Sequence, residues 1–270
     1  MTESTFEVVE QSSKILRLDL TAEEFAAFAE SHDFSEEAVS AVAQVMSYLG
    51  EKKIQTTIRT ILKMSRLPLK APKTFENFDF SLIKGRDVDR LRALPSLSAL
   101  YAHRNLAFIG PAGTGKTHLA QAFGYECCQR GFKTYFIKMS ELRDKFTAAR
   151  RAGNESSVLN GLVRPSCLII DEVGHCEFDK ENTRLFFDLV DRRYNKDGHY
   201  NMVFTSNKNP SLWRDNFNED DSLLCSLDRI FDEATVFNIR GESFRGKKLE
   251  KINLQSSRVK AVAPEGTTTT

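Results

Sequence analysis

The stretch that decides the fold is Gly110-Pro111-Ala112-Gly113-Thr114-Gly115-Lys116-Thr117. It fits the phosphate-binding pattern G-x-x-x-x-G-K-[ST], and it lies between an apolar run, Leu106–Ile109, and a helical pattern over 116–130. Its glycines let the backbone wrap a phosphate chain with N–H groups pointing inward, and the helix start adds a favourable dipole. We expect Lys116 to reach the β- and γ-phosphates and Thr117 to offer its hydroxyl to Mg²⁺. The alternative, a glycine-rich turn with a chance Lys-Thr, is disfavoured by the flanking strand and helix.

Apolar runs and helical patterns alternate along the rest of this region. Further apolar runs cover residues 134–137, 167–170, 202–205 and 235–239, and helical patterns cover 141–151, 181–195 and 223–231. Such alternation is typical of a parallel sheet with helices on both faces. The sequence therefore predicts an α/β domain built around the phosphate loop.

An acidic pair follows the strand predicted over 167–170. Asp171 and Glu172 come directly after this strand, so they should lie at the carboxyl edge of the sheet beside the phosphate loop. We expect Asp171 to hold the magnesium ion through water. Glu172 is expected to be the base that polarises the attacking water.

Three more residues are candidates for the same site. Asn207 ends the next strand and could orient the water and touch the γ-phosphate, or it could cap a turn before Pro210. Arg229 could neutralise the γ-phosphate of a neighbouring subunit, or it could be a surface arginine paired with Asp228 or Asp232. His118 opens the helix after the loop; we place it with the nucleotide-binding residues and expect packing rather than catalysis from its side chain.

The chain divides into four predicted parts. Residues 1–66 form a small all-α domain, 67–80 a proline-containing linker, 81–248 the α/β core, and 249–270 a basic tail that we expect to be disordered. In the first part we expect helices over 21–31, 35–49 and 51–63. The first two are preceded by Thr21 and Ser35 in capping-box patterns.

The charge is unevenly distributed although the net charge is only +1. Residues 1–50 carry ten carboxylates against Lys14 and Arg17. Residues 51–75 carry one, Glu51, against seven basic residues, Lys52, Lys53, Arg59, Lys63, Arg66, Lys70 and Lys73. A basic stretch suits a nucleic-acid backbone, and a solvated helix face is the alternative.

Other features of the sequence narrow the class of protein. The 5 cysteines include no C-x-x-C pair, which argues against a zinc finger or a disulfide framework. No secretory signal and no apolar stretch of membrane-spanning length is visible, so we expect a cytoplasmic protein.

A series of motifs resembles a known family. The order GPAGTGKTHLA, CLIIDEVG, FTSN, SLDRI and IRGESFR, within a match from about Thr74 to Arg245, resembles the IstB-like ATP-binding proteins. These are AAA+ transposition helpers related to the DnaC-type helicase loaders. The resemblance implies an AAA+ P-loop NTPase core, ATP and Mg²⁺ as cofactors, and ATP hydrolysis coupled to homo-oligomer assembly on double-stranded DNA. It also implies a transposase partner encoded nearby, and a place near the nucleotide for Arg245. His175 and Phe244 stand where the family usually carries tyrosine.

Three other functions remain open from the sequence. A helicase loader of the same superfamily would use its N-terminal domain to hold a helicase. A nucleotide-switched adaptor would have little turnover, and Glu172 argues against it because an intact base implies hydrolysis. A small-molecule kinase is disfavoured because no acceptor-substrate motif is visible.

Overall fold

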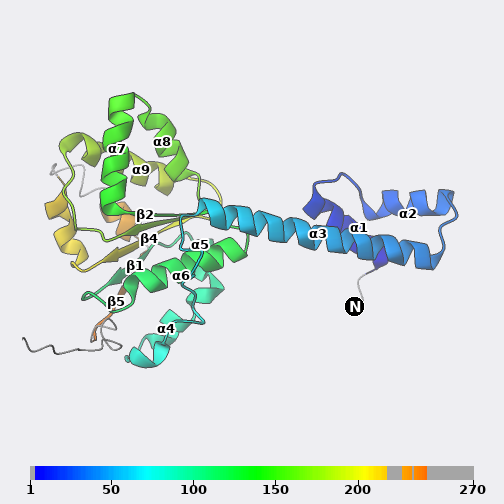
Figure 1. The fold of residues 1–270 in the computed structure, drawn as a ribbon, viewed down its shortest axis with the longest axis horizontal. Helices are drawn as coiled ribbons and strands as arrows, with labels where there is room; N and C mark the ends of the chain where they lie inside the picture. Colours follow the sequence, from blue (N-terminus) through cyan, green and yellow to red (C-terminus); the bar gives the residue numbers. More distant parts are fainter. Residues whose placement is uncertain (1–3, 218–226, 233, 242–270) are drawn as a thin grey trace, which may run out of the picture.

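The computed structural model describes residues 4–217, 227–232 and 234–241 (Figure 1). An α/β core lies at one end of the molecule, and the N-terminal helices lie at the other end (Figure 1). The long helix α3, Glu36–Met64, connects the two.

The core is built on a parallel sheet of five strands in the order β2-β3-β4-β1-β5. The strands are β1 Leu106–Ile109, β2 Thr134–Lys138, β3 Cys167–Asp171, β4 Asn201–Ser206 and β5 Thr235–Asn238. Every residue of β1, β3 and β4 is buried, as expected for continuous apolar runs covered on both faces. The predicted parallel α/β sheet is confirmed.

Helices cover both faces of the sheet, and successive strand residues alternate between them. On one face α7, α8 and α9 pack against Ala107 and Ile109, and on the other α6 packs against Leu106 and Phe108. These helices are α6 Lys116–Gln129, α7 Met139–Ala152, α8 Glu155–Val163 and α9 Lys180–Tyr194. Of them only α8 was not predicted. Residues 227–231 are helical, and the rest of the helix predicted over 223–231 lies outside the described residues.

Short helical segments join these elements. Before β1 they are η1 Phe80–Leu82, α4 Val88–Arg92, η2 Leu94–Ser96 and α5 Ser98–Tyr101, and after β4 comes η3 Pro210–Asn216.

The N-terminal helices form an arm in which α1 packs against both α2 and α3. They are α1 Thr5–Leu16 and α2 Ala22–Ser31, and each begins with a capping box, at Ser4 with Glu7 and at Thr21 with Glu24. The capping box predicted at Ser35 is wrong, because Ala38 stands at the third position; Ser35 caps α3 through its side chain alone. The prediction of separate helices over 35–49 and 51–63 is wrong, because α3 runs through Gly50 without a break. Gly50 is buried, and a Cβ added there would lie 3.7 Å from Ile15 of α1, so α1 packs against this point of the helix.

The segment 65–80 packs on the core. Leu67 and Phe78 are buried with residues of α6 and β1, and the backbone carbonyl of Ser65 accepts a hydrogen bond from the N–H of Phe136 in β2 at 2.8 Å. The C-terminal end of α3 is therefore anchored beside the edge strand β2. In the part of the chain that the structure describes, no helix combines the length and apolar character needed to cross a membrane.

Candidate nucleotide site

The phosphate loop leaves the carboxyl end of β1 with a backbone shape that only glycine adopts easily. Gly110, Gly113 and Gly115 have φ of 151°, 81° and 87°. A side chain at Gly110 would also place its Cβ 2.0 Å from the carbonyl oxygen of Ile239, just after the neighbouring strand β5. Glycine is thus required at this position by both conformation and space.

The loop leads straight into α6, which begins at Lys116. No side chain caps this helix at Gly115 in the described structure. The unpaired N–H groups of a first helical turn, with the helix dipole, attract an anion. Lys116 is buried, and its Nζ donates to the carbonyl oxygen of Pro111 at 2.6 Å, so the ammonium group lies against the loop itself. This arrangement fits the phosphates of a nucleotide.

A hydrogen-bond network connects the loop to the ends of β3 and β4. Thr117 Oγ1 donates to Asp171 Oδ1 at 2.8 Å, and Thr205 Oγ1 donates to the same oxygen. Thr205 Oγ1 in turn accepts from the N–H of Glu172 at 3.0 Å. The hydroxyl of Thr117 and the carboxylate of Asp171 are hard oxygen ligands of the kind that Mg²⁺ prefers. The predicted pair for the metal therefore lies in direct contact.

Asp171 lies in an environment that disfavours its charge. Its side chain is buried, and burial raises the pKa of its carboxyl, although the hydroxyls of Thr205 and Thr117 oppose that shift. A buried carboxylate is costly unless a positive charge accompanies it. A cation bound between Thr117 and Asp171 would supply that charge.

Glu172 is held in an uncommon conformation beside Lys138. Its φ of 62° is rare for a residue with a side chain, and such strain is concentrated at functional sites. Its carboxylate lies 3.1 Å from the Nζ of Lys138, the last residue of β2, and Glu172 is the main cause of the raised pKa of Lys138.

Sequence reasoning missed two members of this site, Lys138 and Thr205. Lys138 pairs with Asp171 in the register of β2 and β3, so a prediction of which strands are neighbours could have found it. Thr205 is the second-last residue of β4, and nothing local in the sequence distinguishes it from a strand residue that only packs.

Asn207 follows β4 at the same edge of the sheet. Its Nδ2 lies 3.3 Å from Nε2 of His175, which lies in the loop that follows β3. The structure therefore places Asn207 at the carboxyl edge with Asp171 and Glu172, as predicted. Its role in orienting water stays a prediction.

The side chain of His118 packs against the segment before the core, in line with the expected packing role. Its Nε2 lies 2.9 Å from the carbonyl oxygen of Thr74, and its ring packs edge-on against Phe78 at 5.1 Å. Burial, followed by the charge of Lys73, lowers the pKa of His118 against the opposing effect of the Thr74 carbonyl. Its side chain thus connects segment 65–80 to α6, and its place among the nucleotide-binding residues stays a prediction.

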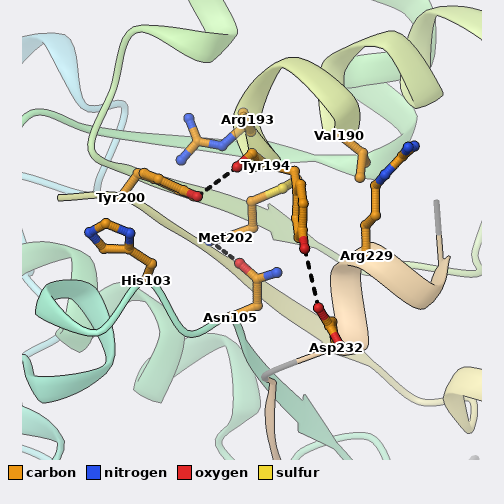
Figure 2. A pocket seen from close by; sticks show the side chains of 9 residues that line it. All are labelled: His103, Asn105, Val190, Arg193, Tyr194, Tyr200, Met202, Arg229 and Asp232. Carbon is orange, nitrogen blue, oxygen red and sulfur yellow. Dashed lines mark hydrogen bonds between the residues drawn. The ribbon is translucent and has the colours of Figure 1, made fainter. Parts of the chain in front are cut away.

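Arg229 lies at the opposite edge of the sheet from the phosphate loop. It helps to line a cavity of about 310 Å³ next to Asn105 and Met202, residues at the amino ends of β1 and β4 (Figure 2). Its ion pair is with Asp191 of α9, at 3.1 Å, whereas the surface alternative for Arg229 had named Asp228 or Asp232. Arg229 therefore lies away from the nucleotide site of its own chain. Arg245, the other predicted arginine, lies outside the described residues.

Replacing Asp171 by asparagine is expected to raise the thermal stability of the nucleotide-free protein. The amide keeps an oxygen for Thr117 and Thr205 but removes a buried charge, and a gain of about 1 kcal/mol corresponds to about 2–4 °C in Tm. Because the folded-state pKa of Asp171 is raised, the wild-type protein loses stability as pH rises through that pKa. The gain should therefore be larger at pH values above that pKa than below it in thermal melts. Asp197→Asn, at an exposed position, is the control, and an unchanged or lower Tm for Asp171→Asn at pH 8 would contradict this account of the site.

Comparison with known proteins agrees with these features. The family of IstB-like ATP binding proteins matches residues 12–252. The ATP-binding protein of insertion sequence IS5376 from Geobacillus stearothermophilus is 34% identical over 85% of this chain and 90% of its own length. That of insertion sequence IS21 from Pseudomonas aeruginosa is 34% identical over 73% of this chain and 72% of its own.

Solved structures share the fold. DnaA from Aquifex aeolicus with bound AMPPCP has a TM-score of 0.52 at 23% identity, over 65% of this chain and 51% of the DnaA chain. A DnaC helicase loader has a TM-score of 0.51 at 17% identity, over 62% of this chain and 97% of its own. The core thus has the AAA+ P-loop NTPase fold, and the chain belongs to the family of IstB-like ATP-binding proteins.

Proposed function

We propose that this protein is a magnesium-dependent ATPase that assembles on double-stranded DNA and assists the transposase of an insertion sequence. The observation that carries the proposal is the network of Thr117, Asp171, Thr205 and Glu172 beside the phosphate loop. It occurs in a chain whose relatives are ATP-binding proteins of insertion sequences, and this favours transposition over helicase loading. The similarity to the DnaC loader, at 17% identity, supports the shared fold alone.

Each side chain of the proposed site has a separate role in hydrolysis. The N–H groups of the loop and Lys116 bind the phosphates, and Thr117 and Asp171 hold Mg²⁺, which would offset phosphate charge when bound. Glu172 accepts a proton from the attacking water, with Lys138 holding its carboxylate in place. Asn207 completes the site as a polar contact for the water or the γ-phosphate.

Arg229 acts on the nucleotide of a neighbouring subunit in this proposal. It lies at the amino edge of the sheet while the phosphate loop lies at the carboxyl edge, so it cannot serve its own site. Its side chain is 41% exposed, and its ion pair with Asp191 lies at the surface, which leaves it accessible to a second copy. An ATP bound between subunits would make assembly depend on the nucleotide.

The basic half of α3 is the proposed DNA surface. Lys52, Lys53, Arg59 and Lys63 are exposed along its last four turns, and Glu51 is the one carboxylate in residues 51–64. Lysine and arginine at this density release counterions from duplex DNA when they bind its phosphates. The helix presents these charges beside the core, where neighbouring subunits could line them up along a duplex.

The double variant Lys52→Glu/Arg59→Glu is expected to weaken duplex binding by at least about tenfold at low salt. Two lost phosphate contacts should also reduce the slope of log K against log salt by about 2. Fluorescence anisotropy with a labelled duplex measures the affinity and its salt dependence. The titrations are done with a non-hydrolysable ATP analogue and with ADP. The wild-type protein should bind the duplex more tightly with the analogue than with ADP.

Lys14→Glu/Arg17→Glu, which makes the same charge change on the distal arm, is the matched control. Equal losses for the two double variants would show that total charge, not this surface, determines binding. Equal wild-type affinity in the two nucleotides would contradict ATP-dependent assembly.

A further inference from the structure

The two halves of helix α3 carry side chains of opposite charge. Its first half carries Glu36 and Glu37 with exposed apolar side chains, and its second half carries the basic residues proposed to contact DNA. The two ends of the helix are about 44 Å apart, because it has 29 residues. The distal half, which packs on α1, therefore presents a different surface from the half beside the core.

The distal surface contains a groove of about 1200 Å³ between α2, α3 and the start of α1. Its apolar lining comes from Phe6 of α1, Ala26 and Ala29 of α2, and Val39 of α3. Phe34, in the turn between α2 and α3, stands at its edge with 38% of its surface exposed. A groove of this kind is a common seat for the apolar face of a helix.

Carboxylates surround the apolar lining. Glu30 of α2 and Glu36 and Glu37 of α3 line the groove, and all three are exposed. Over residues 4–50 as a whole, nine carboxylates stand against Lys14 and Arg17. Such a surface repels the phosphates of DNA and attracts basic side chains.

We propose that this acidic groove binds a basic amphipathic helix of the partner transposase. The apolar face of that helix would fill the groove, and its lysines or arginines would meet Glu30, Glu36 and Glu37. The identity of the partner rests on the proposed function, whereas the chemistry of the bound helix rests on the groove. A second copy of the same groove is disfavoured as the occupant, because two acidic rims would repel each other. The arm would thus hold the protein partner at its tip and DNA at its base.

The test compares two full-length variants with the same total charge. Glu30→Lys/Glu36→Lys reverses the rim, and Asp19→Lys/Glu23→Lys reverses two exposed carboxylates outside the groove lining. The probe is the purified transposase encoded beside the gene, and its affinity for each variant is measured by biolayer interferometry without DNA. We expect the rim variant to lose at least tenfold in affinity and the control to stay within about twofold of wild type. Phe34→Ser, which keeps the charge but removes an apolar contact, should lose a similar factor.

Each of the other possible results contradicts the proposal, and each identifies which part of it fails. If wild-type protein does not bind transposase, the proposed partner fails together with the groove. If it binds but the rim variant and the control behave alike, the partner stands and the groove assignment fails. If the rim variant keeps transposase affinity but changes the sedimentation of the free protein, the groove holds a second copy. If the rim variant loses duplex affinity, which added lysines should not lower, the groove is part of a DNA site.

Discussion

Replacing Glu172 by glutamine is expected to lower steady-state ATP turnover by about a hundredfold to ten-thousandfold, the usual contribution of a general base. The amide keeps the shape of the side chain but cannot accept the proton of the attacking water. ATP binding should stay close to that of the wild-type protein, because the phosphate contacts come from the loop, Lys116 and Thr117. Phosphate release gives the turnover, and titration with a fluorescent ATP analogue gives the affinity.

Glu141→Gln is the matched control for this prediction. Glu141 lies in the first turn of α7 and pairs with Arg66 at 2.9 Å, outside the proposed nucleotide site. The same chemical change there should leave turnover within about twofold of wild type. If Glu172→Gln kept most of its turnover, Glu172 would not be the base, and its strained backbone and its pairing with Lys138 would need another explanation.

Replacing Arg193 by methionine is expected to destabilise the fold by about 3–5 kcal/mol, because several buried carbonyls lose a hydrogen-bond donor at a cost of about 1–3 kcal/mol for each one left unsatisfied. Arg193 is 1% exposed, and its guanidinium donates to five backbone carbonyls. These belong to Leu162, Val163, Pro165, Ser166 and Asn201, so one side chain joins α9 to the end of α8 and to the starts of β3 and β4. Burial lowers the pKa of Arg193 to about 10, which still leaves it charged at neutral pH. Methionine fills similar space but removes one donor from each of the five carbonyls. Those of Pro165 and Ser166 keep a second donor, Lys196 Nζ at 3.0 Å and the N–H of Asn201 at 2.9 Å.

Chemical denaturation at pH 7 measures this effect, and the neighbouring residue provides its control. Arg192 pairs on the surface with Asp188 in the same helix, so Arg192→Met should change the free energy of unfolding by less than about 1 kcal/mol. Similar free energies of unfolding for the two variants would show that the carbonyls regain partners when Arg193 is removed.

The sheet and the residues at its carboxyl edge were predictable from the sequence because their signals are local. A complete phosphate-loop motif fixes a strand before it and a helix after it, and the structure has β1 and α6 there. Asp171 and Asn207 each follow an apolar run, so parallel strands bring them to one edge. Placement was therefore predictable, while the chemical roles of these residues stay predictions.

Features that depend on contacts between distant segments were not predictable. The pairing of Lys138 with Glu172 requires β2 and β3 to be neighbours, and the hydroxyl of Thr205 joins the network only because β4 lies beside β3. Gly50 was expected to end a helix, but packing of α1 against α3 holds the helix together through it. In each case the deciding interaction comes from another element of the fold.

ATP turnover by the purified wild-type protein, measured with and without duplex DNA, tests the central claim most directly. Glu172→Gln provides the background, and Lys52→Glu/Arg59→Glu shows whether the basic half of α3 transmits the effect. We predict that saturating duplex raises turnover severalfold in the wild-type protein, less in the basic-surface variant, and not at all in Glu172→Gln. Turnover that is the same with and without duplex, in protein shown to bind nucleotide, would contradict a DNA-assembled ATPase.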